Sequence, residues 1–280
     1  MTTNEYAQIA KDYYNSTAHE IYKECWGGEN HHLGIFDNTD DFYQAAQKAN
    51  ENLVTKLQVK EGDHVLDIGS GFCGLPRYIV KNTNCEKVTA LNISEKENEY
   101  ARQKNKQENL HHKIDVVDGD FNNMPFPDKN FDILVSQDSM LHSPNKKELL
   151  EECFRVIKPG GMFVFSDILK LPELTEDEAK IVYNRINVPH LATFDFYEKA
   201  LIDANFNVID IQDLGNMNLA KSYQSVYDNL NDKKNFLMKD KNIPQDRIDM
   251  TLKGLKYWVE KASDNKLGWG LFVSQRPNNR

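Results

Sequence analysis

A glycine turn with an aspartate in front of it is the first place in this sequence where residue types and spacing indicate ligand chemistry. Gly69 and Gly71 follow an apolar stretch, and Asp67 stands just before them. Glycine lets the backbone turn sharply and approach a ligand closely, because a Cβ would block positive φ or the ligand itself. A carboxylate in this turn would repel the phosphates of a dinucleotide and attract a cation. Asp67, Gly69, Ser70 and Gly71 therefore predict a site for a positively charged ligand.

Further candidates stand where the next predicted strands end: Asn92, Ile93, Asp120, Phe121 and Gln137. The carboxyl ends of parallel strands surround one crevice at the point where the strand order reverses. An acid about twenty residues after the glycines usually receives ribose hydroxyls, and Asn92 stands at that place. Its amide can still accept and donate hydrogen bonds, although it lacks the negative charge of an acid.

Alternating strand and helix patterns carry these candidates. The predicted strands cover 64–68, 87–92, 114–118, 131–136 and 161–167, and the helices between them cover 75–82, 95–107 and 146–157. Such alternation predicts an α/β fold with a doubly wound, mostly parallel sheet. Two helix starts are marked, by Ser94 with Glu97 as a capping box and by Ser143-Pro144 as cap and first turn.

Helical patterns frame this α/β core at both ends. Residues 1–58 predict an N-terminal helical cap, and the core takes 59–214 together with an antiparallel last strand at 266–276. Between the last two strands, residues 215–265 have apolar residues at helical spacing. We interpret this segment as an inserted helical lid.

Composition limits the partners. The 280 residues have a net charge of −9, which argues against nucleic acid because neutralising phosphates requires clustered Lys and Arg. The four cysteines form no C-x-x-C pair, so neither a disulfide framework nor a thiolate zinc site is indicated, and a reducing compartment is expected. The N-terminus has acids and tyrosines in place of a signal peptide, and no apolar run is long enough to span a membrane. We expect a cytoplasmic protein with a small-molecule partner, no membrane contact and a possible homodimer.

Two separate phrases resemble those of class I S-adenosylmethionine methyltransferases, which have a Rossmann-like, seven-stranded, mostly parallel sheet. The phrase VLDIGSGFCG at 65–74 resembles their first motif, and CFRVIKPGG at 153–161 resembles the end of a later helix. Their ligand carries a sulfonium and an ammonium, as Asp67 would require. The resemblance implies S-adenosylmethionine as cofactor, with Asp120 accepting from the adenine amine, Phe121 covering the ring and Gln137 holding the methionine end.

A second resemblance concerns the methyl acceptor. Residues 137–142, QDSMLH, replace the N/D-P-P-Y/F stretch by which methylases of nucleic acid bases hold their substrate. Tyr14, Tyr22, Trp26 and His142 together resemble phosphobase methyltransferases, which place a tyrosine and a histidine over the acceptor. Taken over the whole chain, the sequence is most similar to sarcosine/dimethylglycine N-methyltransferases, which complete the synthesis of glycine betaine.

The implied reaction assigns roles to six residues. An aliphatic amine is mostly protonated near pH 7, so a proton must leave before its lone pair can attack a methyl group. We expect Tyr14 and His142 to take that proton, while the aromatic faces of Tyr22 and Trp26 lie against the cofactor sulfonium. A zwitterionic acceptor also needs a partner for its carboxylate, for which Arg185 with His190 nearby is our choice. No metal is expected.

Several alternatives remain open. The glycine turn could lack a ligand, the acidic turn at 118–121 could simply be solvated, and Arg185 could be a surface residue. His31 and His32 could form a metal site, although too few spaced ligands surround them. The chain could also be a nicotinamide oxidoreductase, a phosphoethanolamine-type methyltransferase or a non-catalytic S-adenosylmethionine-binding protein.

Overall fold

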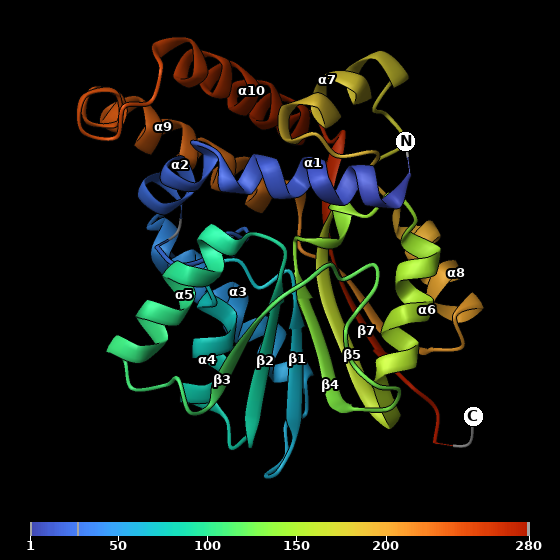
Figure 1. The fold of residues 1–280 in the computed structure, drawn as a ribbon. Coiled ribbons are helices and arrows are strands. Elements are labelled where there is room, and N and C mark those ends of the chain that lie inside the picture. The colour runs from blue at the N-terminus through green and yellow to red at the C-terminus, as the bar shows by residue number, and fades with distance from the viewer. Residues whose placement is uncertain (1, 27, 279–280) are drawn as a thin grey trace.

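The computed structural model describes residues 2–26 and 28–278, and these form one seven-stranded sheet with helices around it (Figure 1). The strand order is β3-β2-β1-β4-β5-β7-β6, and only β7 runs antiparallel to its neighbours. The predicted doubly wound, mostly parallel sheet with an antiparallel last strand is therefore confirmed. The strands are β1 (His64–Ile68), β2 (Lys87–Asn92), β3 (Ile114–Asp118), β4 (Phe131–Gln137), β5 (Ile157–Lys170), β6 (Asn207–Asp213) and β7 (Leu267–Gln275).

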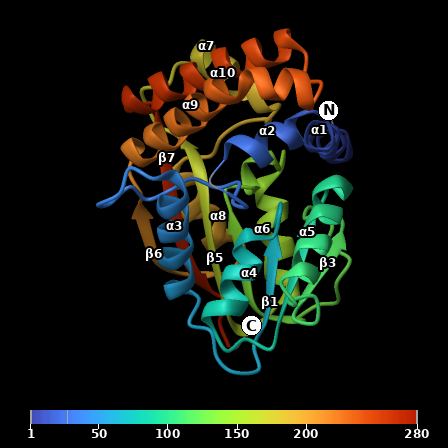
Figure 2. The same ribbon diagram turned by 90° about the vertical axis from the view of Figure 1, so that its left-hand side faces the viewer.

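Helices bury both faces of the sheet. Neighbouring residues of a strand point to opposite faces of the sheet. In β1 both faces carry apolar side chains: Val65 packs into one hydrophobic cluster and Leu66 into another. The Val65 face is covered by α3 (Phe42–Lys56) and α4 (Gly74–Asn82), with α5 (Glu95–Gln107) beside them, and the Leu66 face by α6 (Lys146–Val156) and α8 (Phe194–Asp203). Figure 2 shows these two groups of helices on either side of the strands.

A separate helical layer covers the carboxyl ends of the parallel strands (Figures 1 and 2). It consists of α1 (Thr3–Asn15), α2 (Ala18–Cys25), α7 (Glu176–Ile186), α9 (Asn216–Asp240) and α10 (Gln245–Ser263). The predicted cap and the predicted lid thus lie together, and their buried side chains share one hydrophobic cluster. The division of the chain into cap, core and lid remains a prediction.

Two local predictions need correction. The cap of α6 is Asn145, whose side chain accepts a hydrogen bond from Glu148 N. Ser143 is not the cap, because its Oγ donates to Asn122 Oδ1. Ser143 directly follows a short 3-10 helix, η1 (Met140–His142). Strand β5 begins at Ile157, earlier than predicted. Its register against β4 shifts after Ile157, and Gly160 has a φ of +79°, so the KPGG segment interrupts the pairing without ending the strand.

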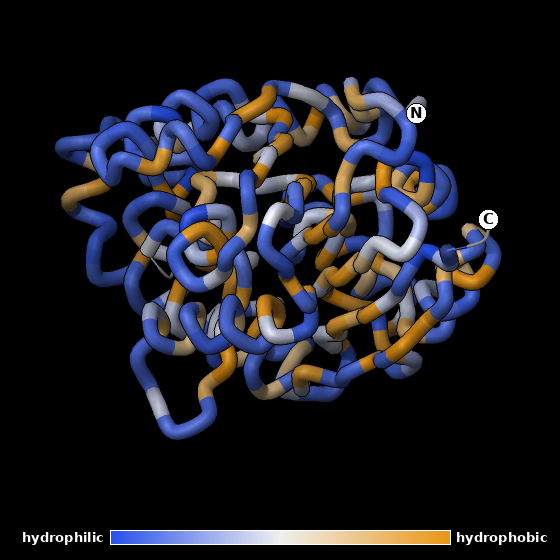
Figure 3. The backbone as a smooth tube through the Cα atoms, turned by 90° about the horizontal axis from the view of Figure 1, so that it is seen from below, coloured by the Kyte–Doolittle hydropathy of each residue, from blue (hydrophilic) through white to orange (hydrophobic). Residues whose placement is uncertain are grey.

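Hydropathy agrees with this arrangement. Figure 3 shows hydrophobic stretches of backbone in the middle of the molecule and hydrophilic stretches over most of its periphery. Among the described helices, none combines the length and the apolar character needed to cross a membrane.

Candidate active site

A cavity lies at the carboxyl ends of β1, β2 and β4, beneath α1. Most of the predicted site residues line it: Tyr14, Asp67, Gly69, Ser70, Gly71, Asn92, Ile93, Asp120, Phe121, Gln137 and His142. The fold therefore brings these residues together, as the strand ends required, while their individual roles remain predictions.

The glycine turn forms the floor of the cavity. Gly69 and Gly71 have φ values of +77° and +49°, a region that residues with a Cβ rarely adopt. The backbone N–H groups of Gly69 and Ser70 both donate to Leu91 O, at 2.8 and 3.2 Å, which fixes the turn to the end of β2. The turn is thus fixed by hydrogen bonds to β2 and lines the cavity.

Two carboxyl groups in the cavity wall form no ion pair with a Lys or Arg of the described residues. Asp67 is buried at the end of β1, and burial raises its pKa to about 8. Burial likewise raises the pKa of Glu97 to about 8. Glu97 Oε1 has no hydrogen-bond partner among the described residues; the nearest basic atom given for it is His31 Nδ1 at 3.6 Å. A ligand with positive charge and hydroxyl donors would satisfy both groups.

Glu97 is a site residue that sequence reasoning missed. Ser94 Oγ does accept from Glu97 N, as the capping pattern predicts. The Glu97 side chain, however, turns away from the helix start into the cavity, where its Oε2 accepts from Asn92 Nδ2 at 3.1 Å. A carboxylate therefore stands beside Asn92 after all, supplied from α5. The lack of an acid at position 92 was the signal that could have led to it.

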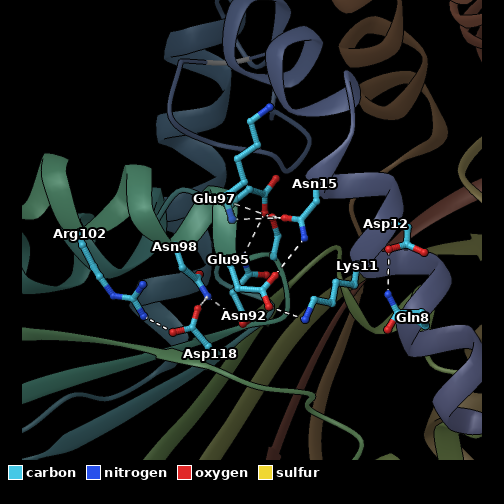
Figure 4. A network of polar contacts seen from close by, with 12 residues as sticks. Gln8, Lys11, Asp12, Asn15, Asn92, Glu95, Glu97, Asn98, Arg102 and Asp118 are labelled. Atoms are coloured by element: carbon cyan, nitrogen blue, oxygen red, sulfur yellow. Dashed lines mark hydrogen bonds and ion pairs between the residues drawn. The ribbon is translucent and has the colours of Figure 1, made fainter.

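Polar contacts hold α1 across the mouth of the cavity (Figure 4). Lys11 forms an ion pair with Glu95, and Asn15 Nδ2 donates to Glu95 Oε2 at 3.0 Å. Asn15 Oδ1 also accepts from Ser94 Oγ at 2.7 Å. These contacts join α1 to the start of α5 and so keep Tyr14, in the last turn of α1, over the cavity.

The residues predicted to hold adenine and the methionine end also face the cavity. Asp120 Oδ1 accepts from the backbone N and the side-chain Nδ2 of Asn122, at 2.9 and 2.8 Å, which orients the carboxylate. Phe121 packs against the neighbouring core. Gln137 Oε1 is buried and has no hydrogen-bond partner among the described residues, so it can accept from a ligand.

Tyr14 and His142 meet at one end of the cavity. Tyr14 Oη and His142 Nε2 are 2.9 Å apart, although the two residues come from α1 and η1. Burial raises the pKa of Tyr14 well above 10 and, together with the nearby Lys146, lowers the pKa of His142 to about 4. Near pH 7 both groups are therefore neutral, so the phenol and the imidazole can share one hydrogen bond and pass a proton along it.

Asp138 is a second carboxylate that sequence reasoning did not select. It follows β4 with a φ of +51° and lines the same cavity. Its Oδ1 accepts from Ser166 Oγ at 2.6 Å and from Trp269 Nε1 at 2.8 Å, and its Oδ2 accepts from Leu33 N at 2.9 Å. These three donors fix the orientation of the Asp138 carboxyl group in the cavity wall that also contains Tyr14 and His142.

Tyr22 and Trp26 do not line this cavity. Their rings stack with centroids 4.3 Å apart, and Tyr22 lies 5.6 Å from the Tyr14 ring. Trp26 in turn meets Tyr223 of α9 edge to face, at 6.1 Å. Tyr22 and Trp26 therefore belong to a row of contacting aromatic rings that runs from Tyr14 to Tyr223. Their proposed contact with the cofactor remains a prediction.

Arg185 and His190 also lie outside the cavity lining. The Arg185 guanidinium carbon lies 5.0 Å from the Tyr223 ring and 5.1 Å from the Trp258 ring, and no described carboxylate forms an ion pair with it. Its Nε is buried without a hydrogen-bond partner in the described chain. His190 is half-buried between α7 and α8, and its backbone oxygen accepts from Lys146 Nζ at 3.0 Å.

The adjacent histidines both line the cavity, but their rings make different contacts. His31 packs on Phe72 with ring centroids 4.0 Å apart, and His32 Nδ1 lies 2.8 Å from Leu33 O. Within residues 2–26 and 28–278, no group of three or more His, Cys, Asp or Glu side chains is arranged to hold a metal ion.

Comparisons with known proteins agree with this geometry. A family model described as a methyltransferase domain matches residues 66–165. A sarcosine/dimethylglycine N-methyltransferase from Halorhodospira halochloris is 34% identical over 272 residues, covering 96% of both chains. In fold, the chain is similar to a crystal structure from Galdieria sulphuraria described as a sarcosine dimethylglycine methyltransferase, with a TM-score of 0.83, 24% identity and coverage of 92% of this chain and 98% of that one.

A further fold likeness is to a phosphoethanolamine N-methyltransferase from Haemonchus contortus, solved with phosphomonomethylethanolamine and S-adenosylhomocysteine. The TM-score is 0.79 at 18% identity, covering 96% of this chain and 60% of that one. The unpartnered carboxyl and amide oxygens of the cavity suit a cationic sulfonium cofactor with hydroxyl and ammonium donors. The near-complete match to the Halorhodospira enzyme shows the family: this chain belongs to the sarcosine/dimethylglycine N-methyltransferases, and its methyl donor is S-adenosylmethionine.

Proposed function

We propose that this protein methylates the amine nitrogen of sarcosine and dimethylglycine and so forms glycine betaine. The observation that carries the proposal is the 2.9 Å contact between Tyr14 Oη and His142 Nε2 at the edge of the cofactor cavity. The relative from Halorhodospira halochloris, whose name gives these acceptors, supports it over nearly the full chain.

The chemistry requires a neutral amine. S-adenosylmethionine, when bound, supplies a methyl group whose bond to sulfur breaks as the bond to the amine nitrogen forms. The ammonium of a free amino acid has a pKa near that of lysine, about 10.4, so each transfer must remove one proton first. Tyr14 Oη accepts this proton as its own proton passes to His142 Nε2. This step requires the imidazole tautomer with a free Nε2, which the low pKa of His142 permits.

Charge and aromatic faces support the same acceptor. Asp138 offers its carboxyl group to an ammonium that enters beside the Tyr14–His142 dyad. The rings of Tyr14, Tyr22 and Trp26 would stabilise a methylated ammonium by roughly 0.5 to 2 kcal/mol each. A cation that becomes more methylated loses hydrogen-bond donors, so aromatic faces become its best partners.

Arg185 is our proposal for the residue that binds the acceptor carboxylate. Its guanidinium lies against both Tyr223 and Trp258, without an acidic partner among the described residues, so its charge is available to an anion. Arg185→Lys keeps the charge and loses the planar fork, so we expect the KM for sarcosine to rise about 10- to 100-fold, equivalent to about 1.5 to 3 kcal/mol. Initial rates at varied sarcosine measure this. Arg102→Lys, which changes an ion pair with Asp118 on the outside of the core, is the matched control and should leave the KM unaltered.

Binding of S-adenosylmethionine should release protons near pH 7. Burial raises the pKa values of Asp67 and Glu97 to about 8, so both are largely protonated at that pH. A sulfonium, an ammonium and ribose hydroxyls favour the ionised carboxylates, lower both pKa values and drive protons into the buffer. Calorimetric titrations in phosphate and in Tris should therefore give different binding enthalpies, and Glu97→Gln should reduce the difference. Equal enthalpies in the two buffers would show that neither carboxyl changes its proton on binding.

The choice of acceptor is tested directly with isotopically labelled S-adenosylmethionine. Glycine, sarcosine, dimethylglycine and phosphoethanolamine are offered separately, and the labelled products are separated. We expect label in dimethylglycine and betaine. Label only in a phosphobase would assign the protein to the second candidate activity, which the fold likeness to the Haemonchus contortus enzyme favours.

The proposed lid consists of α9 and α10. These helices carry Tyr223 and Trp258, the two aromatic residues that contact Arg185. Gly34 N donates to Ser222 Oγ at 2.9 Å, and Phe36 N donates to Asn218 Oδ1 at 3.0 Å. Helix α9 is therefore tied to the N-terminal segment, so closure over the site would move the two together.

A further inference from the structure

A buried lysine lies directly behind the dyad. Lys146 is the first residue of α6 and only 1% of its surface is exposed. Its Nζ donates to Leu141 O at 3.3 Å and to Ser143 O at 3.0 Å, on both sides of His142 in the chain. The third bond goes to His190 O at 3.0 Å, in the connection between α7 and α8. Lysine side chains are almost never fully buried unless they are paired, so this burial indicates a specific role.

The three bonds show which form the lysine takes. An ammonium has three N–H donors, whereas a neutral amine has two. All three carbonyl oxygens lie at hydrogen-bond distance from Nζ, so the geometry matches the charged form. Burial lowers the pKa of Lys146, and the Coulombic attraction of Asp167 of β5 opposes part of that lowering. Asp167 is itself held by Tyr197, whose hydroxyl donates to it at 2.6 Å.

We propose that Lys146 is a positioning residue for the methyl transfer, whose ammonium clamps the turn that carries His142 onto the segment of His190 and so sets His142 against Tyr14. This inference rests on the proposed function, because it assigns Lys146 its importance through the dyad. Lys146 is not among the residues that line the cavity. We therefore expect it to act through the position and the protonation of His142.

The clamp also accounts for the charge state of the dyad. The titratable groups around this turn are Tyr14 from α1, Asp138 after β4, Asp167 from β5, Lys146 from α6 and His190. Among them, Lys146 is the neighbour whose charge lowers the pKa of His142, after the larger effect of burial. His190, with its pKa also lowered to about 4, stays neutral and adds no charge near pH 7. An uncharged His142 can accept the proton that Tyr14 gives up.

Two substitutions separate the clamp from the charge. Lys146→Met removes the charge and all three donors, whereas Lys146→Gln removes the charge and keeps two N–H donors. We expect kcat with sarcosine to fall about 10²-fold in Lys146→Met, the order of loss that a misplacement of about 1 Å can cause. The loss in Lys146→Gln should be smaller. In both variants the affinity for S-adenosylmethionine and the KM for sarcosine should stay within about twofold of wild type.

The second readout needs no turnover. Histidine NMR titration of the cofactor-free protein should show the His142 imidazole becoming protonated at higher pH in both variants than in wild type. The acid limb of the kcat–pH profile should move to higher pH in the same variants, which a purely structural lysine would not cause. Lys147→Met changes the neighbouring lysine, which is exposed, and is the matched control that should leave both readouts unchanged.

The outcomes are distinct. A wild-type protein that does not methylate sarcosine or dimethylglycine would overturn the proposed function, whatever Lys146 does. Unchanged kcat and an unchanged His142 titration in Lys146→Gln, in a wild-type background that does methylate these acceptors, would overturn the role of Lys146 alone. If Lys146→Met does not fold, Lys146→Gln decides the question.

Discussion

Replacing Gly69 with valine is expected to abolish binding of S-adenosylmethionine. A Cβ at this position would lie 2.3 Å from Ser139 Oγ and 2.4 Å from Ser139 Cβ, and the φ of +77° disfavours a branched side chain in any case. Ser139 has little room to move, because its hydroxyl donates to Ile68 O at 2.9 Å and shares a hydrogen bond with Ser136. The turn under the cofactor must therefore deform. Calorimetric titration should detect no binding where wild type binds.

The control for this prediction is Gly62→Val. Gly62 has a similar φ of +88°, but a Cβ there meets nothing within 4 Å. Both variants thus introduce comparable backbone strain, and only Gly69→Val obstructs the cavity floor. Circular dichroism should show folded protein in both cases. Micromolar binding retained by folded Gly69→Val would mean that the cofactor does not pass over this turn.

Removing either member of the Tyr14–His142 pair should cost about 10² to 10⁴ in kcat with dimethylglycine, the usual contribution of a positioned acid or base. The pKa of His142 is about 4 and that of Tyr14 is well above 10, so the hydrogen-bonded neutral pair persists from pH 6 to 9. The loss should therefore appear throughout this range. Tyr14→Phe, His142→Ala and the double variant are compared at saturating substrate, with cofactor affinity measured in each.

The double variant decides whether the pair acts as a unit. Residues that share one step are strongly non-additive, so each single change should cost nearly as much as both together. Tyr13→Phe is the matched control, since Tyr13 lies beside Tyr14 with ring centroids 5.1 Å apart and is not the partner of His142. Near-wild-type rates in both single variants would mean that the enzyme selects acceptor molecules that arrive already neutral.

The same pKa values give a sign for the pH dependence of stability. His142 in the folded protein has a pKa below its ordinary 6.5, so the unfolded chain binds more protons between about pH 4 and 6.5. His142 therefore weakens the fold as the pH falls through that window. Asp67 and Glu97 act oppositely: burial raises their pKa values from 3.8 and 4.5 to about 8, so the folded protein binds more protons between those values and their contribution to stability is lost as the pH rises from about 4 to about 8.

Much of the fold could be predicted from the sequence because its signals are local. Apolar runs such as 64–68 and the glycine turn after them specify a strand and its end without reference to other segments. Once strands alternate with helices, the carboxyl ends must meet at one edge, and this placed Asn92, Asp120 and Gln137 around one cavity. The start of α6 was predicted correctly at Lys146, but its cap was wrong, because Ser143 donates its hydroxyl to Asn122, a residue distant in sequence, and Asn145 caps the helix instead.

The rest of the site depends on side-chain directions that no spacing rule supplies. Glu97 looked like a capping residue, and only the structure shows its carboxylate turned toward Asn92. Asp138 was recognised as a site residue only from the structure, in which Trp269 Nε1 of the last strand donates a hydrogen bond to its carboxyl group. Tyr14 and His142 were paired from family resemblance, since 128 positions separate them in the chain. Lys146 could not be singled out among the lysines without knowing which carbonyl groups surround it.

Transfer of a labelled methyl group from S-adenosylmethionine to dimethylglycine, measured in wild type and in Tyr14→Phe, tests the central claim most directly. The account predicts labelled betaine from wild type, and at least about 10²-fold less from a variant that binds the cofactor with unchanged affinity. Wild-type protein that binds S-adenosylmethionine but labels neither dimethylglycine nor sarcosine would contradict it. So would a Tyr14→Phe variant that forms betaine at the wild-type rate.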